Sequence, residues 1–324
     1  MKIRLAQINP IVGNIPYNTR LIKKIINDSS NVDLIIFPEL CITGYPPQDL
    51  LLDDKFLLDV HNGLEEIVNA VSNNVVVLGY PNLSQNGCLY NSAAVIQEGK
   101  IAGVYSKNLL PTYDVFDEAR YFTMSNEVDP IKVFIDNKEV ILGVQICEDL
   151  WSSDYSLNVA ESLLNKGAEL IINISASPYR KKIFNKRLKL CMDRCADLKY
   201  YFIYCNLVGA QDELVFDGRS FILNSKKDVV ALAKSFDEEI LDFNSNKVEK
   251  IKSIKNDSNQ NIYDALVLGI KDYFKKSKFK KAVIGLSGGI DSALTAAIAT
   301  QALGSDNVIG ISMPSIYSSN HSRQ

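Results

Sequence analysis

A cysteine at the end of an apolar run is the clearest candidate nucleophile in this chain. Cys147 lies in the segment VQICEDLW at residues 144–151, where two carboxylates and the only tryptophan follow it. A cysteine at a strand end usually belongs to the core. Burying two carboxylates beside a structural thiol would be costly, so this setting favours chemistry at Cys147.

A thiol attacks as its thiolate, which needs a nearby base or cation to form near neutral pH. The chain has only two histidines, His61 and His321, which disfavours a histidine base. The base is therefore expected to be a carboxylate, and the cation a lysine or arginine.

Two other motifs supply such groups. Glu39 follows a buried strand in FPEL at residues 37–40, and Lys107 lies in YSKNLLP at residues 105–111. Each residue alone is better explained by an ordinary role, Glu39 in a surface turn and Lys107 as a solvated cation. Their occurrence together with Cys147 is what predicts a site.

A second kind of chemistry is indicated near the C-terminus. Residues 285–292 read GLSGGIDS, between an apolar strand at 282–284 and a helix at 292–303. Backbone N–H groups and the positive end of a helix at such a turn can hold a polyphosphate. No Gly-Lys-Ser/Thr follows, so the loop is not a Walker motif. The alternative is a tight strand-to-helix turn without a ligand.

Alternating strands and helices must position these groups. Apolar runs predict strands at 2–7, 34–37, 75–79, 93–97, 141–145, 170–174 and 202–206, and amphipathic patterns predict helices at 18–27, 53–71, 156–166 and 186–199. Nearly continuous apolar strands are typical of sheets covered on both faces, so this is an α/β layered domain. We expect a first domain at 1–243, a polar linker at 244–261, and a second domain at 262–324 that opens with a helix to about residue 276.

Composition narrows the class of protein. Length allows two domains, and 47% hydrophobic with 23% charged residues is ordinary for a globular protein. A net charge of −3 points to neither nucleic acid nor a membrane surface. No apolar run is long enough to span a membrane, and no signal peptide is recognised. Six scattered cysteines predict neither zinc nor disulfides, so a reduced, cytoplasmic protein is expected.

The three motifs around Glu39, Lys107 and Cys147 resemble the Glu-Lys-Cys triad of the nitrilase superfamily. The segment SGGIDS resembles the loop of ATP pyrophosphatases. Residues 107–122 and 209–220 are similar to segments of glutamine amide-transfer domains, and residues 313–319 to a later segment of the synthetase domain. Over essentially its whole length the chain thus resembles the glutamine-dependent NAD synthetase family.

The resemblance implies a four-layer αββα nitrilase sandwich, followed by a truncated Rossmann-like ATP-pyrophosphatase domain. It implies that Glu39 takes the thiol proton, that Cys147 attacks the glutamine amide, and that Lys107 and the backbone N–H of Glu148 stabilise the oxyanion. Tyr113 and Ser177 would contact glutamine. Glu148 and Glu118 would hold its α-amino group or support the triad.

One position departs from the family pattern. Relatives usually carry a basic residue about six positions after the serine equivalent to Ser177, where this chain has Ile183. Lys182 is the candidate for the glutamine carboxylate if the loop is shifted by one, and Arg180 is a weaker one. A solvated basic loop is the alternative.

The second domain would adenylate deamido-NAD with ATP and Mg²⁺ and then aminate it with the ammonia released by the first. The phosphate-gripping residues would be Gly285, Leu286, Ser287, Gly288, Gly289, Ile290, Asp291 and Ser292. About 60 residues of that domain are too few to bury both faces of a sheet, so we expect a poorly supported loop and an intact glutaminase half.

Two other functions stay open at this point. One is a free-standing amidase or carbamoylase of the nitrilase class, and the other is a catalytically idle interaction module. The resemblance implies a homo-oligomer, with no nucleic-acid or membrane partner and no metal in the first domain.

Overall fold

Two six-stranded sheets lie face to face in the computed structural model, which describes residues 1–195 and 198–314. The first sheet has the order β14 (Glu239–Asn244), β1 (Lys2–Gln7), β2 (Leu34–Ile36), β3 (Val75–Leu83), β4 (Leu89–Gln97) and β5 (Lys100–Ser106). The second has the order β13 (Val229–Leu232), β12 (Phe221–Asn224), β9 (Tyr201–Asn206), β8 (Leu170–Ser175), β7 (Lys138–Ile146) and β6 (Ile131–Ile135).

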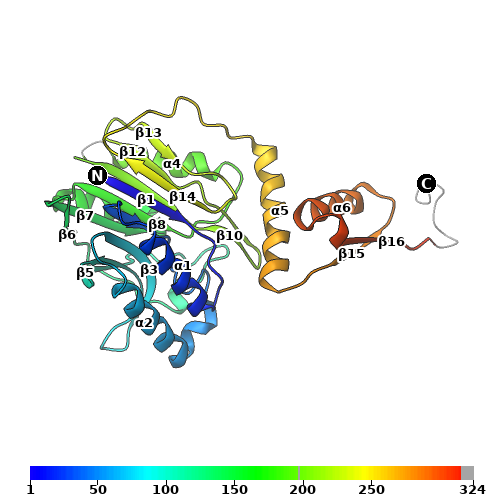
Figure 1. The fold of residues 1–324 in the computed structure, drawn as a ribbon, viewed down its shortest axis with the longest axis horizontal. Helices are drawn as coiled ribbons and strands as arrows, with labels where there is room; N and C mark the ends of the chain where they lie inside the picture. Colours follow the sequence, from blue (N-terminus) through cyan, green and yellow to red (C-terminus); the bar gives the residue numbers. More distant parts are fainter. Residues whose placement is uncertain (196–197, 315–324) are drawn as a thin grey trace.

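Helices cover the outer face of each sheet. Apolar side chains of both sheets form one core between them, with Val77 on one side and Val144 on the other. α1 (Ile15–Asn27) and α2 (Asp54–Val68) pack on the first sheet, and α3 (Val159–Asn165) and α4 (Ile183–Arg194) on the second. The result is the predicted αββα sandwich (Figure 1).

Local sequence explains why these elements form. β2 and β8 read LII and LIINIS and are buried at every position, as expected for strands covered on both faces. α1 begins after Asn14, whose side chain accepts a hydrogen bond from the Tyr17 N–H, and its isoleucines face the sheet. All seven predicted strands and all four predicted helices of the first domain are present, with ends displaced by up to five residues.

Parallel pairing aligns the strand ends. β1, β2 and β3 are parallel, and so are β7, β8 and β9. β5 runs antiparallel to β4, which runs antiparallel to β3, so β5 points the same way as β3. The carboxyl ends of β2 and β5 therefore meet at one edge of their sheet, and those of β7 and β8 at one edge of theirs.

The C-terminal part begins with α5 (Ser258–Lys276), four residues earlier than predicted. The Asp257 side chain accepts hydrogen bonds from the N–H groups of Asn259 and Gln260, which starts the helix inside the polar run that we interpreted as linker. Residues 245–257 contain no helix or strand.

α5 stands against the hairpin of β10 (Val208–Gln211) and β11 (Leu214–Asp217), as Figure 1 shows. A buried polar contact fixes it there. Asp272 Oδ2 accepts hydrogen bonds from Asn9 Nδ2 and from the Ala210 N–H, both at 2.7 Å. Lys276 Nζ lies 3.5 Å from Asp272 Oδ2 and donates to the Ala210 carbonyl at 2.7 Å.

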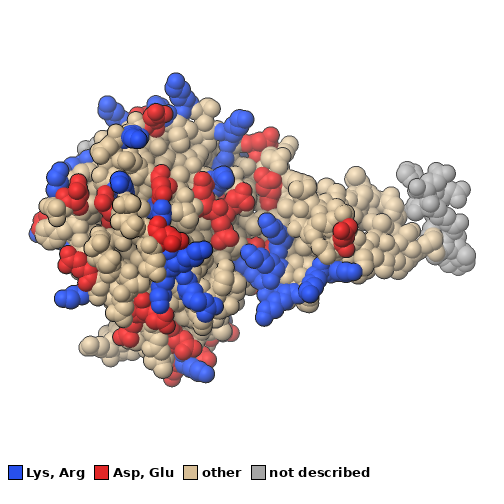
Figure 2. Space-filling model, in the orientation of Figure 1, with Lys and Arg blue, Asp and Glu red and all other residues tan. Residues whose placement is uncertain are grey.

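Beyond α5, β15 (Ala282–Leu286), α6 (Ile290–Leu303) and β16 (Val308–Ser312) form a small unit around a two-stranded parallel sheet. Val283 is 64% exposed and Ile290 79% exposed. Figure 2 shows few charged side chains over this unit. The expected failure to bury both sheet faces is thus confirmed, and residues 315–319 of the segment singled out above lie outside the described residues. Among the described residues, no helix is long and apolar enough to cross a membrane.

Candidate active site

Four strand ends carry the predicted site residues. Glu39 follows β2, Lys107 follows β5, Cys147 follows β7, and Ser177 follows β8. All four are buried, with exposed fractions of 0%, 1%, 6% and 5% respectively. Burial excludes the ordinary alternatives for Glu39 and Lys107, because neither is a surface residue.

Three donors fix the Glu39 carboxylate. Lys107 Nζ and Asn91 Nδ2 both donate to Glu39 Oε1 at 2.8 Å, and the Ala176 N–H donates to Oε2 at 2.7 Å. A carboxylate offers about four acceptor positions, so one position on Oε2 stays available for a proton. The geometry suits Glu39 to act as a general base.

Lys107 lies between two carboxylates. Its Nζ donates to Glu118 Oε1 at 2.8 Å and to Oε2 at 2.7 Å, in addition to Glu39. Burial lowers the pKa of Lys107, but attraction to Glu118 and Glu39 outweighs it and holds the pKa well above its usual value. Lys107 therefore stays a cation.

Glu118 begins the short 3₁₀ helix η2 (Glu118–Arg120) and also accepts a hydrogen bond from the Tyr45 hydroxyl at 2.9 Å. Burial raises the pKa of Glu118, and Lys107 lowers it only in part. One cation shared by two buried carboxylates leaves an excess of negative charge, which favours uptake of a proton by Glu118.

Cys147 begins the 3₁₀ segment η3 (Cys147–Asp154) with a φ of 43°, in the left-handed region that a non-glycine residue rarely adopts. Burial raises the pKa of its thiol well above the usual value, Glu39 raises it further, and Lys107 opposes this. The resting thiol is therefore protonated. Its activation requires transfer of the proton to a base, and Glu39 is the carboxylate with the strongest effect on it.

Glu148 places another carboxylate beside the Cys147 thiol. It accepts hydrogen bonds from the Tyr113 hydroxyl at 2.9 Å and the Tyr155 hydroxyl at 3.0 Å. Burial raises the pKa of Glu148, and these two bonds partly offset the increase. Tyr113 is 44% exposed and so lies between this carboxylate and solvent.

Asp149 braces the site through four hydrogen bonds that its carboxylate accepts. Its Oδ1 accepts from the N–H groups of Asn108 and Leu109, at 3.1 and 3.0 Å. Its Oδ2 accepts from the Tyr105 hydroxyl at 2.7 Å and the Ile146 N–H at 2.9 Å. Burial nevertheless raises the pKa of Asp149 to about 6. Asp149 thereby fixes the turn after Lys107 to the strand that ends at Cys147.

The basic residues near Ser177 differ in their surroundings. Lys182 is exposed and has a φ of 67°, immediately before α4, while Ile183 is buried. Arg180 is exposed and lies 3.7 Å from Asp114. Arg187, by contrast, is fully buried beside Ser177.

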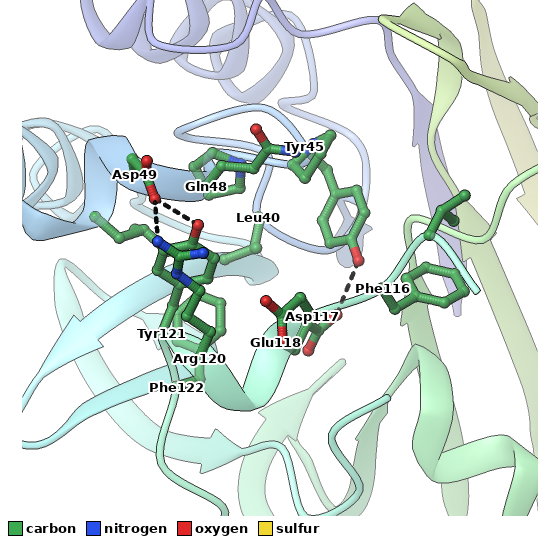
Figure 3. A pocket seen from close by; sticks show the side chains of 14 residues that line it. Leu40, Tyr45, Gln48, Asp49, Phe116, Asp117, Glu118, Arg120, Tyr121 and Phe122 are labelled. Atoms are coloured by element: carbon green, nitrogen blue, oxygen red, sulfur yellow. Dashed lines mark hydrogen bonds and ion pairs between the residues drawn. The ribbon is translucent and has the colours of Figure 1, made fainter. Parts of the chain in front are cut away.

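A cavity of about 300 Å³ adjoins the cluster at Glu118 and Tyr45. Figure 3 shows the Tyr45 hydroxyl pointing at Glu118, with Phe116 nearby. Farther out, Asp49 pairs with Arg120 at 3.5 Å and accepts from the Tyr121 hydroxyl at 2.6 Å (Figure 3). A cavity of this volume falls in the range of small-molecule sites.

Several residues of the site were missed from the sequence: Tyr45, Asn91, Tyr155 and Arg187. Two left a signal. Asn91 stands beside Ser92 in a strand that is otherwise apolar up to Gln97, and Arg187 occupies a buried position of α4 at helical spacing from Ile183 and Cys191. A polar residue in an apolar stripe is costly unless it has a partner, so both could have been flagged.

The glycine-rich loop connects β15 to α6 as predicted. Gly288 has a φ of 81°, and Gly289 caps the helix without a side chain. The Ser292 hydroxyl donates to the Gly289 carbonyl at 3.0 Å and lies 3.2 Å from the Ser287 hydroxyl. The first N–H groups of this 14-residue helix receive no side-chain cap, and residues 287–291 of the turn are exposed.

Comparisons with known proteins give two family matches along the chain. A family model described as carbon-nitrogen hydrolase matches residues 2–251, and one described as NAD synthase matches residues 262–324. A glutamine-dependent NAD(+) synthetase of Synechocystis is 38% identical over 99% of this chain and 61% of that protein. One of Aquifex aeolicus is 37% identical over 99% of this chain and 62% of that protein.

A solved structure of glutamine-dependent NAD+ synthetase from Acinetobacter baumannii, in complex with ADP, superposes with a TM-score of 0.91 at 35% identity. It covers 99% of this chain and 61% of that one, so the chain spans about three fifths of the length of these relatives. The carbon-nitrogen hydrolase match includes Glu39, Lys107 and Cys147 together with both sheets that carry them, and the chain therefore belongs to the carbon-nitrogen hydrolase family.

Proposed function

We propose that this chain hydrolyses the side-chain amide of glutamine to glutamate and ammonia at Cys147. The observation that carries the proposal is the buried Glu39 carboxylate, held by Lys107, Asn91 and Ala176 with one acceptor position left beside a protonated thiol. The likeness to glutamine-dependent NAD synthetases supports glutamine as the substrate.

In the proposed reaction the Cys147 sulfur attacks the amide carbonyl while its proton passes to Glu39. Lys107 and the Glu148 N–H stabilise the negative charge that develops on the carbonyl oxygen. Glu39 returns the proton to the leaving nitrogen, which departs as ammonia and leaves a thioester. Water, deprotonated by Glu39, then releases glutamate and restores the thiol.

The surrounding groups suit an amino acid. Glu148, with the Tyr113 and Tyr155 hydroxyls bound to it, is the acceptor proposed for the α-amino group. Ser177, on the adjacent strand end, is proposed for the α-carboxylate, and Lys182 stays a candidate for additional positive charge. Glu118 supports the triad by holding Lys107.

We further propose that the ammonia serves the amidation of deamido-NAD to NAD, an ATP-dependent reaction of the kind its relatives are named for. Residues Gly285 to Ser292 would hold the phosphates of ATP through exposed N–H groups at the start of α6. The ADP in the Acinetobacter baumannii relative supports a nucleotide site in this kind of protein. A homo-oligomer and a cytoplasmic location belong to the same proposal.

Mg²⁺ at such a site would neutralise phosphate charge. Nucleotide-bound Mg²⁺ needs only one or two protein carboxylates besides phosphate and water. Asp291 is the carboxylate of the loop, and the described residues contain no group of three or more His, Cys, Asp or Glu side chains arranged to hold a metal ion by themselves. Asp291 fits this limited role.

Glutamate release tests the first half of the proposal. The full chain is expected to form glutamate from glutamine, and Cys147→Ala to abolish this, while Cys88→Ala, at a half-buried cysteine in the loop between β3 and β4, leaves it unchanged. A preference for simple amides or N-carbamoyl compounds would instead favour a free-standing amidase. A Cys147 that ignores every amide and electrophile would indicate an idle interaction module.

A further inference from the structure

Arg187 is among the largest side chains of this protein that are fully buried. It occupies the sheet-facing side of α4 together with Phe184 and Cys191, where an apolar residue would ordinarily stand. An isolated cation in such a place is strongly unfavourable. Asp217 compensates its charge, with Arg187 Nη1 donating to Asp217 Oδ1 at 2.6 Å.

The remaining donors of the guanidinium converge on one short segment. Arg187 Nη2 donates to the carbonyls of Ser177 at 2.7 Å and Pro178 at 2.8 Å. Arg187 Nε donates to the Ser177 hydroxyl oxygen at 3.1 Å. Arg187 therefore recognises the backbone turn and the hydroxyl of Ser177 together.

Other contacts place this turn beside the triad. The Ser177 N–H donates to Asn206 Oδ1 at 3.0 Å, and the preceding N–H, of Ala176, donates to Glu39. Ser177 follows β8, the parallel neighbour of the strand that ends at Cys147. The backbone of Ser177 is thus fixed on both sides, and only its hydroxyl proton has freedom to choose a partner.

The direction of one hydrogen bond limits what that partner is. Because Nε–H donates to the Ser177 oxygen, the hydroxyl accepts on the Arg187 side and its own proton must point elsewhere. A group that receives this proton must be an acceptor. In an amino-acid substrate whose amide is at Cys147, the α-carboxylate is the strong acceptor that a buried cation behind the serine would favour.

We propose that Arg187 is the positioning residue for carboxylate recognition: it orients the Ser177 hydroxyl as a donor to the α-carboxylate of the substrate and supplies positive charge from behind it. This inference rests on the proposed glutaminase function. It explains how the chain can dispense with a basic residue at position 183, where Ile183 is buried and the adjacent Lys182 is exposed.

Two electrophiles separate carboxylate recognition from general damage to the site. Azaserine carries the α-carboxylate and α-amino group of an amino acid, whereas iodoacetamide is small and neutral, and both alkylate a reactive thiol. Arg187→Lys keeps the charge but loses the fork geometry. We expect this variant to raise KM for glutamine about tenfold and to lower the rate at which azaserine alkylates Cys147 about tenfold. Losing roughly one charge-assisted hydrogen bond has an effect of this size. Alkylation by iodoacetamide and kcat should each change less than about twofold.

Arg4→Lys is the matched control, because Arg4 on β1 also makes a two-pronged pair with a carboxylate, that of Asp242 on the neighbouring strand β14 of the first sheet. It should leave both alkylation rates and KM unchanged. If Arg187→Lys does not fold, as judged by thermal unfolding, Ser177→Ala removes only the hydroxyl and should show the same selective loss toward azaserine. If Arg187→Lys folds, adding it to Ser177→Ala should change KM and the rate of alkylation by azaserine by less than about a further twofold.

An equal loss of alkylation rate with azaserine and with iodoacetamide would overturn the positioning role, and so would an unchanged KM in both Arg187→Lys and Ser177→Ala. Either result would leave the glutaminase proposal intact. Failure of the unaltered chain to release glutamate would overturn both together. The two failures are therefore distinguishable in one set of assays.

Discussion

The triad and the glycine-rich loop are built in opposite ways. The hydrogen bonds of Glu39 join residues 52, 68 and 137 positions apart in the sequence. The side-chain bonds within the loop join residues only 2, 3 and 5 positions apart. The first site exists only once the sandwich is assembled, whereas the loop geometry is encoded within a few residues.

Their surroundings differ in the same sense. Val144, on the strand that leads to Cys147, is fully buried between the two sheets, while Val283, on the strand that leads to the loop, is 64% exposed. A recognisable motif therefore says little about how firmly its surroundings hold it. The long-range site is the one with the stronger support.

The largest expected effect is at the shared cation. Lys107→Met leaves Glu39 and Glu118 buried without their partner, so we expect unfolding free energy to fall by about 3–5 kcal/mol and glutamate release to fall about 10³-fold. Lys276→Met, at the lysine paired with Asp272 on α5, should cost about 1 kcal/mol and leave glutamate release within twofold. Urea unfolding and a glutamate assay measure both. Similar losses of stability and activity in Lys107→Met and Lys276→Met would contradict the contrast between the triad and the C-terminal part of the chain.

Two glycines compare how closely the backbone is packed beside the triad and in the C-terminal part of the chain. A Cβ at Gly79 would lie 2.3 Å from the Leu40 nitrogen and 2.6 Å from the Glu39 Cα, so Gly79→Ala must displace the general base. We expect a loss of about 3 kcal/mol and about 10²-fold in glutamate release.

At Gly269, within α5, the nearest atom is Val215 Cγ2 at 3.7 Å, which is ordinary contact. Gly269→Ala should therefore stabilise the protein by about 0.5–1 kcal/mol through helix propensity. Thermal unfolding reports both variants. A stable, active Gly79→Ala would mean that the turn at Glu39 is not held as closely as described.

Asp149 gives the sandwich a pH dependence of known sign. Its pKa is raised to about 6 in the folded state, so the folded protein binds this proton more tightly than the unfolded chain. Its contribution to stability is complete below the unfolded value near 4 and is lost as pH rises through about 6, by up to about 3 kcal/mol.

Asp149→Asn should remove this component of the slope of unfolding free energy between about pH 4 and 6, with an overall loss because one amide oxygen cannot accept from both sides. Asp129→Asn, at an exposed carboxylate paired with Lys166, serves as the control and should leave the slope in place. An unaltered slope in Asp149→Asn would show that another group governs it.

The smallest expected effect compares two valines. Val144→Thr places a hydroxyl between the sheets and should cost about 1–3 kcal/mol. Val283→Thr makes the same replacement at an exposed position and should shift the free energy of unfolding by less than about 0.5 kcal/mol. A large loss from Val283→Thr would reveal packing around β15 in solution beyond what the described residues supply.

Continuous apolar runs made much of the sandwich predictable. β2, β8 and residues 142–146 of β7 are buried on both faces and so carry their signal in composition alone. β10 to β13 were missed because four residues are too few to display a period. β5 was missed because its mixed burial interrupts the apolar pattern.

The site divides similarly. Residue types and strand-end positions singled out Glu39, Lys107 and Cys147, and the resemblance of their three motifs to a known triad predicted them as neighbours. Their buried partners, Asn91 and Arg187, depend on which helix face or strand meets which edge, and no local pattern specifies this. The start of α5 was misplaced because the capping Asp257 lies in a run of polar residues that reads as linker.

The left-handed backbone at Cys147 has a counterpart at Leu40, which directly follows the general base and has a φ of 46°. Each such residue costs about 1–2 kcal/mol. The donor and the acceptor of the proton are thus both attached to strained backbone. Engineering for thermostability near these turns would trade catalytic competence for robustness, whereas unstrained helices such as α5 offer gains without that penalty.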